Sequence, residues 1–292
     1  MKPPPFEYHR PATLGEALAL LEQLPEAKPL AGGQSLIPAM NFRLAAPPAL
    51  VDLGAVAGIS GIAETRDGGL RIGAMTRHRA IELSAAVAGR APLLAEAMPH
   101  IAHVQIRSRG TIGGSLAHAD PAAELPAVMV ALRATMVVSG ARGERRVTAE
   151  EFFTGLFATA LLPGELLTAV EIPGPAARSG SAFLELSRRH GDYALVGVAA
   201  VVELEAEGTV AAARIALFSV GEGPVLAHHA ASALLGTRGD AAAVAAAAAG
   251  VQGDIDPPGD IHASPEYRRR LAEVLVGRAA TRARDRAVQA SR

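Results

Sequence analysis

The chain has 292 residues, of which 50% are apolar and 20% are charged, and its formal net charge is −1. This composition is sufficient for a sizeable buried core, excludes a disordered chain, and gives no global sign of binding to nucleic acid or to an anionic membrane. The sequence contains no cysteine. Disulfides, iron–sulfur clusters, thiolate metal sites and cysteine nucleophiles are therefore excluded, and any redox chemistry of this chain requires a bound organic cofactor.

The sequence predicts neither a signal peptide nor a membrane span. The first residues, 1–6, contain no apolar segment of the kind that a signal peptide requires. The longest apolar stretches, such as Ala241–Ala249, are too short to cross a bilayer. We therefore expect a soluble, cytoplasmic protein.

The first predicted elements lead to a glycine-rich turn. Thr13 and Glu16 have the spacing of a capping box and precede the apolar run Ala17–Leu24, which predicts a helix. Lys28–Ala31 is predicted to be a strand that ends at a double glycine, and Ser35 then opens another helix. A strand followed by a glycine turn and the start of a helix favours an anion, because backbone N–H groups are free there.

Short strands and helices alternate in the region after Pro47. Apolar runs that end in turn residues predict strands over Ala49–Leu53, Gly69–Met75, part of Met129–Val138 and Leu166–Ile172. Helices are expected over Thr76–Ser84 and Pro92–Ile101, and a second capping box stands at Thr148–Glu151.

The last third of the chain has a pattern of its own, after a linker rich in Gly, Pro and Ser that ends near Ser181. Three β-rich runs precede an alanine-rich helical half; they are Ala182–Ser187, Leu195–Leu204 and Val210–Val220. Ser264 and Pro265 fit the N-cap and the first turn of a last helix. This order predicts an α+β C-terminal domain of roughly 110 residues.

Two double-glycine turns, Ala31–Ser35 and Thr111–Ser115, are the strongest candidates for ligand binding. Glycine lets backbone N–H groups approach an anion closely, so two such turns could hold a diphosphate from two sides. Neither turn has the spaced glycines of a Rossmann motif or the Lys-Ser/Thr of a P-loop. Taken alone, each is more simply explained as a turn between a strand and a helix with no ligand.

The wider context of both turns resembles one protein family. The matching stretches are 5–8, 31–38, 41–44, 105–115, 118–126, 187–194, 260–264 and 267–268. They are similar to the FAD-binding medium subunit of the molybdenum hydroxylases, the family of carbon monoxide dehydrogenase, of nicotine and quinoline dehydrogenases, and of the flavin domain of xanthine dehydrogenase. The resemblance covers essentially the whole chain.

The resemblance implies an α+β fold with a definite division of the chain. Residues 1–176 would form the FAD-binding fold of the vanillyl-alcohol oxidase and p-cresol methylhydroxylase type, in two α+β lobes of about 1–54 and 55–176. A C-terminal α+β domain of the carbon monoxide dehydrogenase flavoprotein type would follow at 177–285. Residues 286–292 would be a tail.

The resemblance also assigns the FAD diphosphate to backbone N–H groups of both turns, with hydroxyl donors added by Ser35 and Thr111. The implied cofactor-binding residues are Ala31, Gly32, Gly33, Gln34, Ser35, Leu36, Thr111, Ile112, Gly113, Gly114 and Ser115.

Three further residues are candidates for the rest of the cofactor. By resemblance, Asp120 and Glu124 approach the ribose or ribityl hydroxyls, and Tyr193 lies near the isoalloxazine ring. The two acidic residues stand one turn apart if their segment is helical, and an acidic first helical turn after Pro121 is an equal alternative. For Tyr193 the alternative is a half-buried strand tyrosine. Leu184 aligns with a lysine of xanthine dehydrogenase, so the tuning of the flavin differs there.

Other polar residues carry weaker hypotheses. His100, His103 and His118 do not have the spacing of a metal site. Arg107 and Arg109 could offset diphosphate charge or belong to a solvated loop. The late arginines fit a solvated helix face or tail, with partner docking as the alternative; they are Arg278, Arg282, Arg284 and Arg286.

The expected function is electron relay. By resemblance, a large molybdopterin subunit acts on the substrate, a small subunit with [2Fe–2S] clusters passes electrons to FAD on this chain, and FAD passes them to an external acceptor, in a dimer of heterotrimers. The missing cysteines agree with clusters on another chain, and no catalytic side chain or metal site is predicted here. The alternatives are a self-standing FAD-dependent oxidase or dehydrogenase and a non-enzymatic nucleotide-binding module on the same fold.

Overall fold

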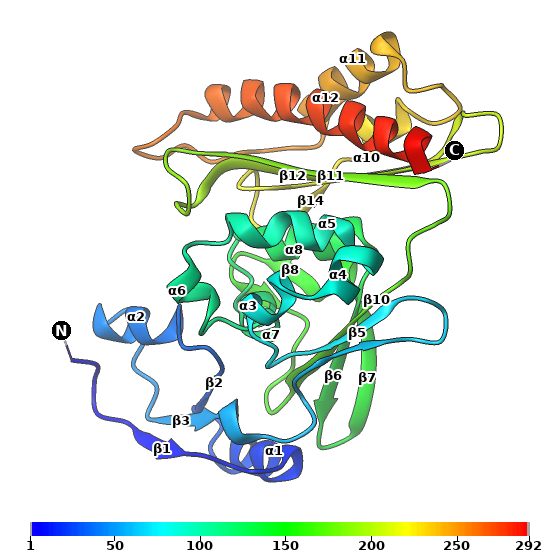
Figure 1. The fold of residues 1–292 in the computed structure, drawn as a ribbon. Helices are drawn as coiled ribbons and strands as arrows, with labels where there is room; N and C mark the ends of the chain where they lie inside the picture. The colour runs from blue at the N-terminus through cyan, green and yellow to red at the C-terminus, as the bar shows by residue number, and fades with distance from the viewer. Residues whose placement is uncertain (1, 291–292) are drawn as a thin grey trace.

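The computed structural model describes residues 2–290, which form two lobes and a C-terminal domain (Figure 1). Each of these three parts is built around its own sheet, of three, five and four strands in chain order, and a two-stranded ribbon is added to the second lobe. Within the described part of the chain, no helix has the length and apolar character that crossing a membrane demands.

The N-terminal lobe contains a parallel sheet in the order β1-β3-β2. Its strands are β1 (Glu7–His9), β2 (Lys28–Leu30) and β3 (Ala49–Asp52). Helix α1 (Leu14–Gln23) covers this sheet, and its predicted capping box is present: Thr13 Oγ1 accepts the Glu16 N–H at 3.2 Å, and Glu16 Oε2 accepts the Thr13 N–H at 3.3 Å. Because the strands are parallel, their carboxyl ends meet at one edge, where α2 (Leu36–Asn41) and the short η1 (Leu53–Ala55) begin.

The second lobe combines an antiparallel sheet with a group of short helices. The sheet order is β4-β5-β10-β6-β7, with β4 (Ile62–Glu64), β5 (Leu70–Gly73), β6 (Thr135–Gly140), β7 (Gly143–Thr148) and β10 (Leu166–Ile172). The ribbon is β8 (Phe153–Gly155) with β9 (Ala158–Thr159). The helices are α3 (His78–Glu82), α4 (Ala85–Arg90), α5 (Pro92–Ala97), η2 (Met98–His100), α6 (Val104–Arg107), α7 (Ile112–His118), α8 (Glu124–Ala131) and α9 (Ala149–Phe152).

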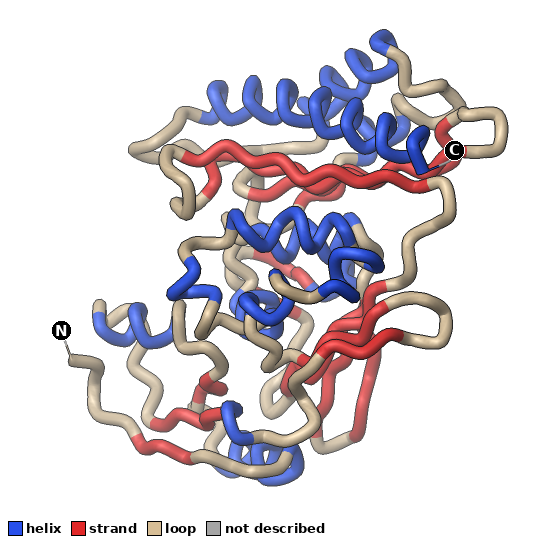
Figure 2. The backbone as a smooth tube through the Cα atoms, in the orientation of Figure 1, coloured by secondary structure: helices blue, strands red, loops and turns tan. Residues whose placement is uncertain are grey.

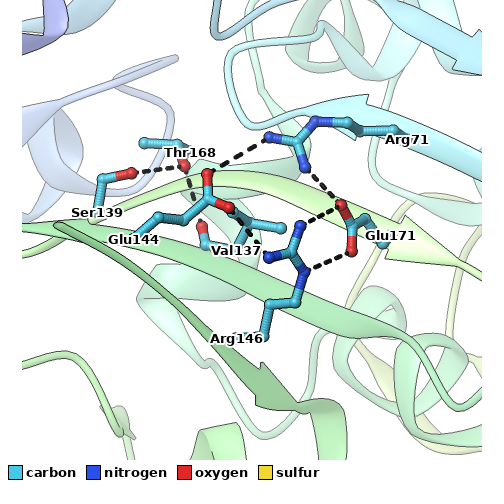
Figure 3. A network of polar contacts seen from close by, with 7 residues as sticks. All are labelled: Arg71, Val137, Ser139, Glu144, Arg146, Thr168 and Glu171. Carbon is cyan, nitrogen blue, oxygen red and sulfur yellow. Dashed lines mark hydrogen bonds and ion pairs between the residues drawn. The ribbon is translucent and has the colours of Figure 1, made fainter.

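A polar network crosses the strands of the second lobe (Figure 3). Glu171 on β10 accepts from Arg71 at 2.5 Å and from Arg146 at 3.1 Å, and Arg146 also pairs with Glu144 at 3.2 Å. Thr168 stands at a bulge of β10, where its hydroxyl donates to the Val137 carbonyl at 3.1 Å. The charged side chains are partly to fully exposed, so each of these pairs contributes little to stability.

The C-terminal domain is an antiparallel sheet with a long helix on one face. The strands, in the order β11-β12-β13-β14, are β11 (Ser179–Ser187), β12 (Ala194–Leu204), β13 (Val210–Phe218) and β14 (Val225–Leu226). Helix α12 (Pro265–Ala290) lies along β11 and β12, with α10 (His228–Ser232), α11 (Ala241–Gly250) and η3 (Val251–Gly253) beside it. The predicted N-cap is present, since Ser264 Oγ accepts the Tyr267 N–H at 3.2 Å.

The second face of this sheet packs on α5 and α8 of the second lobe, so helices lie on both sides of it (Figure 2). Phe183 and Phe218 project from the sheet into the hydrophobic core of the second lobe, with ring centroids 5.8 Å apart. Gly197 provides the space for the Phe218 ring, which a Cβ at this position would overlap. The two domains therefore share one continuous apolar core.

The segment Met129–Val138 is part strand, as predicted, since β6 begins at Thr135 after α8 ends at Ala131. Two other expectations about local structure need correction. The segment from Asp120 to Glu124 is a turn, and helix α8 starts at Glu124, so these two residues do not lie on one helix face. Residues 286–290 are not a tail, because α12 continues through Ala290 and Ala287 is buried; residues 291–292 lie outside the described part.

Candidate cofactor site

The two double-glycine turns, which are about 80 residues apart in sequence, lie in direct contact. A Cβ on Gly32 would stand 2.5 Å from the Arg109 carbonyl oxygen and 2.7 Å from Gly110 Cα, and a Cβ on Gly114 would stand 3.2 Å from Ala31 Cβ. Real Cβ atoms do not approach backbone this closely, so glycine is required where the turns touch.

The first turn leaves a run of backbone N–H groups without partners. The N–H groups of Gly33, Gln34, Ser35 and Leu36 make no hydrogen bond within residues 2–290. Gly33 has a φ of +73°, and the Gln34 side chain folds back to donate to the Gly32 carbonyl at 3.2 Å. Consecutive N–H groups of this kind form a concave site for an anion.

Gly33 and Gln34, which carry the first two of these N–H groups, line a cavity of about 570 Å³ at the carboxyl edge of the parallel sheet, and Ser35 and Leu36 follow them directly in the chain. It is lined by Arg10, Leu30, Ala31, Gly32, Gly33, Gln34, Ile37, Pro38, Asn41, Asp52, Gly54, Arg77 and Arg109. The lining thus includes three guanidinium groups and one carboxylate. Such a balance favours an anionic ligand with more than one negative charge.

Hydrogen bonds fix the charged wall of the cavity. Arg77 donates to the Arg109 carbonyl, which ties the second lobe's loop to the start of α3. Burial and the neighbouring Arg109 lower the pKa of Arg77. Asp52 is held by the Gly54 N–H at 2.8 Å and by the Tyr8 hydroxyl, so its carboxylate is already occupied.

The second turn does not present bare N–H groups, contrary to the expectation that both turns hold the anion in this way. The Ile112 N–H donates to the Thr76 carbonyl at 3.1 Å and the Gly113 N–H to the Ala74 carbonyl at 2.8 Å. The Gly114 N–H donates to Thr111 Oγ1 at 3.1 Å, and the Ser115 N–H to the Thr111 carbonyl. The turn is therefore a close-packed support for the first one, and only Arg109, just before it, lines the cavity.

Arg107 has neither of its two predicted roles. Its side chain is buried and forms a two-pronged ion pair with Glu82, at 2.9 Å and 3.1 Å, and it donates to the Ile101 carbonyl at 2.9 Å. This arginine ties α6 to α3 and lies away from the cavity lining.

The remaining predicted residues form a second group where the C-terminal domain meets the second lobe. Asp120 accepts the Ala122 N–H at 2.9 Å in a turn. Glu124 is buried, and burial, with Glu185 and Asp120 nearby, raises its pKa to about 7. Tyr193, in the connection from β11 to β12, is 69% exposed, and partial burial of its hydroxyl together with Asp120 raises its pKa. None of the three lines the 570 Å³ cavity.

Sequence reasoning missed Arg10, Asp52 and Arg77 as cavity residues. A signal for two of them was present, because Arg10 follows β1 and Asp52 ends β3, and parallel strands end at one edge. It also missed His78, which packs behind Gly110 and whose two ring nitrogens have no partner within residues 2–290.

Comparison with known proteins gives two family matches that together span most of the chain. Residues 4–175 match the FAD binding domain in molybdopterin dehydrogenase, and residues 181–283 match the CO dehydrogenase flavoprotein C-terminal domain.

Individual relatives and structures agree with these matches. The chain is 43% identical to the 6-hydroxypseudooxynicotine dehydrogenase complex subunit alpha of Paenarthrobacter nicotinovorans, over 98% of this chain and 97% of the relative. It is 41% identical to the carbon monoxide dehydrogenase medium chain of Afipia carboxidovorans, over 98% and 99%. A solved carbon monoxide dehydrogenase from Hydrogenophaga pseudoflava matches with a TM-score of 0.95 and 41% identity, over 98% of this chain and 99% of that chain. The predicted resemblance and fold class are confirmed.

Proposed function

The chain belongs to the family of FAD-binding subunits of molybdopterin dehydrogenases, and from this premise we propose that it binds FAD and relays electrons within a molybdenum hydroxylase. In this proposal a [2Fe–2S] subunit delivers the electrons and an external acceptor removes them. The molybdopterin and the iron–sulfur clusters belong to partner chains, in agreement with the absence of cysteine from this one.

The open N–H groups of the first turn carry this proposal. We assign the FAD diphosphate to the N–H groups of Gly33, Gln34, Ser35 and Leu36. Gly32 allows the two glycine turns to pack against each other, and the three cavity arginines supply positive charge. Thr111 to Ser115 would act mainly by fixing that turn. The cavity volume is in the range of known ligand pockets, and its charge suits a diphosphate.

The second residue group would serve the other end of the cofactor. We propose that Tyr193 shields the isoalloxazine ring and that Asp120 accepts hydrogen bonds from hydroxyl groups. FAD itself supplies the electron chemistry, while the chain holds it, sets its electrostatic surroundings and limits the access of water. We further propose a dimer of heterotrimers with a large and a small partner subunit, located in the cytoplasm.

The visible spectrum of the purified full chain, and of its complex with partners, tests this function. We expect a flavin spectrum with about one FAD per chain, and co-purification with a molybdenum- and iron-containing partner. A colourless chain that binds no FAD would refute the cofactor. A yellow chain that oxidises small molecules unaided and binds no partner would refute the relay.

The Gly32→Ala variant tests the assigned diphosphate site, with Gly174→Ala as a matched control. Both substitutions place a Cβ against backbone, 2.5 Å from the Arg109 oxygen and 2.8 Å from the Gly68 oxygen respectively, but Gly174 is remote from the cavity. We expect Gly32→Ala to lose FAD and Gly174→Ala to retain it. Equal FAD content in both variants would contradict the assignment.

A further inference from the structure

A buried cluster of acid–base groups lies where the C-terminal domain packs against the second lobe. Glu124 begins α8 and is 8% exposed, and Glu185 lies on β11 with its side chain 3% exposed. His100 ends η2, and its Nδ1 lies 3.3 Å from Glu185 Oε1. The three side chains thus come from three separate elements, one of them in the other domain.

This cluster has more negative charge than its surroundings neutralise. Glu185 Oε2 is buried and has no hydrogen-bond partner within residues 2–290. Of the charged groups in that range that act most strongly on Glu124, Glu185 and Asp120 are acidic, and His100 alone is basic. Glu124 and Glu185 are both removed from water, and the partly exposed imidazole of His100 pairs with Glu185 alone, so a negative charge on Glu124 is poorly compensated.

The other titratable groups around the cluster do not relieve this excess. Those that face it are Glu96 on α5, Asp120 before α8, and His190 and Tyr193 between β11 and β12. The arginines nearest to Glu96 are already paired with it: Arg286 at 2.6 Å and Arg282 at 3.7 Å. These two arginines of α12 therefore pair with Glu96 and do not neutralise the cluster.

The cluster is connected both to solvent and to the region assigned to the isoalloxazine ring. The His100 side chain is 35% exposed, which gives protons a route in from water. On the other side, Asp120 and Glu124 both raise the pKa of Tyr193, after burial, so charge at Glu124 is felt at that tyrosine. Because this electrostatic effect is mutual, a negative charge added near Tyr193 must raise the pKa of Glu124.

We propose that Glu124, together with Glu185 and His100, takes up a proton when FAD bound to this chain is reduced. The inference rests on the proposed function. Two electrons come from the iron–sulfur subunit or from an added reductant, and FAD itself takes one proton from water as it is reduced, which leaves one added negative charge. A second proton from bulk water then binds a carboxylate oxygen of the cluster. No covalent bond of the chain breaks, and the proton returns to water on reoxidation. The negative charge that reduction adds drives the uptake.

The test is the pH dependence of the reduction potential of FAD in the loaded full chain. A tenfold change in proton concentration shifts the potential of a two-electron couple by about 30 mV for each proton taken up. We expect the wild type to show a steeper slope than Glu124→Gln, by about half a proton at most at pH 7, where a group with a pKa of about 7 is already half protonated, and by more at higher pH. Glu22→Gln, an exposed residue of α1, is the matched control and should keep the wild-type slope.

An infrared difference spectrum between reduced and oxidised protein provides an independent readout. Proton uptake predicts a gain in the carbonyl stretch of a protonated carboxylic acid on reduction, which disappears in Glu124→Gln. If Glu124→Gln does not fold, Glu185→Gln takes its place in this comparison. If neither variant folds, the presence or absence of the protonated-carboxyl signal in the wild-type spectrum decides the question. Equal slopes in wild type and variant, or no protonated-carboxyl signal in the wild type, would overturn the proposal. Failure to bind FAD is seen in the visible spectrum and would refute the proposed function instead.

Discussion

His78 makes the stability of this protein sensitive to acid at one identifiable place. The residue opens α3 behind the second glycine turn, where its backbone N–H donates to the Gly110 carbonyl at 2.9 Å. Its ring is 4% exposed, and neither ring nitrogen has a hydrogen-bond partner within residues 2–290. Burial, with Arg107 and Arg77 nearby, lowers its pKa from 6.5 to about 4. The ring is therefore neutral at pH 7.

The magnitude follows from the two pKa values. Between pH 6.5 and 4 the unfolded chain binds a proton at this histidine and the folded chain does not, so the folded state loses stability as pH falls through that window. Each unit of pKa difference is worth about 1.4 kcal/mol, which gives a total of about 3 kcal/mol. Above pH 6.5 this contribution is fully present.

Urea unfolding of the full chain between pH 7.5 and 4, compared with His78→Leu, measures this effect. Leucine keeps the buried volume and gives up only a weak contact of the ring with the Thr111 backbone, which does not reach hydrogen-bond geometry, so we expect a cost below about 1.5 kcal/mol at pH 7.5. The difference in unfolding free energy between the two proteins should then shift by about 3 kcal/mol toward the variant as pH falls to 4. A difference that stays constant over this range would refute the reasoning.

Three further predictions concern other buried positions. Arg107→Ala leaves Glu82 paired only with Arg79, at 2.9 Å, and removes the hydrogen bond to the Ile101 carbonyl, so we expect urea unfolding to show a loss of about 2–3 kcal/mol. Arg146→Ala, at the exposed network of Figure 3, should cost much less. Gly197→Ala would place a Cβ inside the Phe218 ring and should abolish soluble expression or cost several kcal/mol in thermal unfolding. The control Gly89→Ala, in open space on α4, should stabilise the protein by up to about 1 kcal/mol. The pKa of Glu124 is raised to about 7 in the folded state, so the wild type loses stability as pH rises from 4.5 to 8. The free energy of unfolding of Glu124→Gln should therefore rise by about 3 kcal/mol relative to that of wild type over this range. An unchanged difference between the two proteins would count against a protonated Glu124.

Local signals in the sequence predicted local structure well. The Thr13–Glu16 capping box and the Ser264 N-cap are both formed by hydrogen bonds between residues three positions apart, so their patterns carry the whole interaction. The position of the first glycine turn after a strand follows from the same kind of reasoning.

The hydrogen-bond partners of the N–H groups in the second turn were not predictable in this way. Its N–H groups donate to the carbonyl groups of Ala74 and Thr76, more than thirty residues earlier, and a sequence pattern does not show which distant strand end will supply an acceptor. The same reason explains Arg107, whose partner Glu82 lies on another helix. Residues 286–292 were predicted to be a tail, yet Arg286 donates to Glu96 and to the Ser181 carbonyl and so holds the end of α12 against the C-terminal sheet.

Glu124 and His78 show how one physical cause, burial, has opposite consequences for two residues of the same lobe. Burial disfavours the charged form of both, so it raises the pKa of the carboxylic acid to about 7 and lowers that of the imidazole to about 4. Falling pH therefore restores stability at Glu124 over much of the window in which it removes stability at His78, and the two contributions are of similar size. A nearly flat pH profile of the wild type would consequently be compatible with both assignments, because the two slopes cancel. Only the paired variants, each compared with wild type at every pH, separate the two sites.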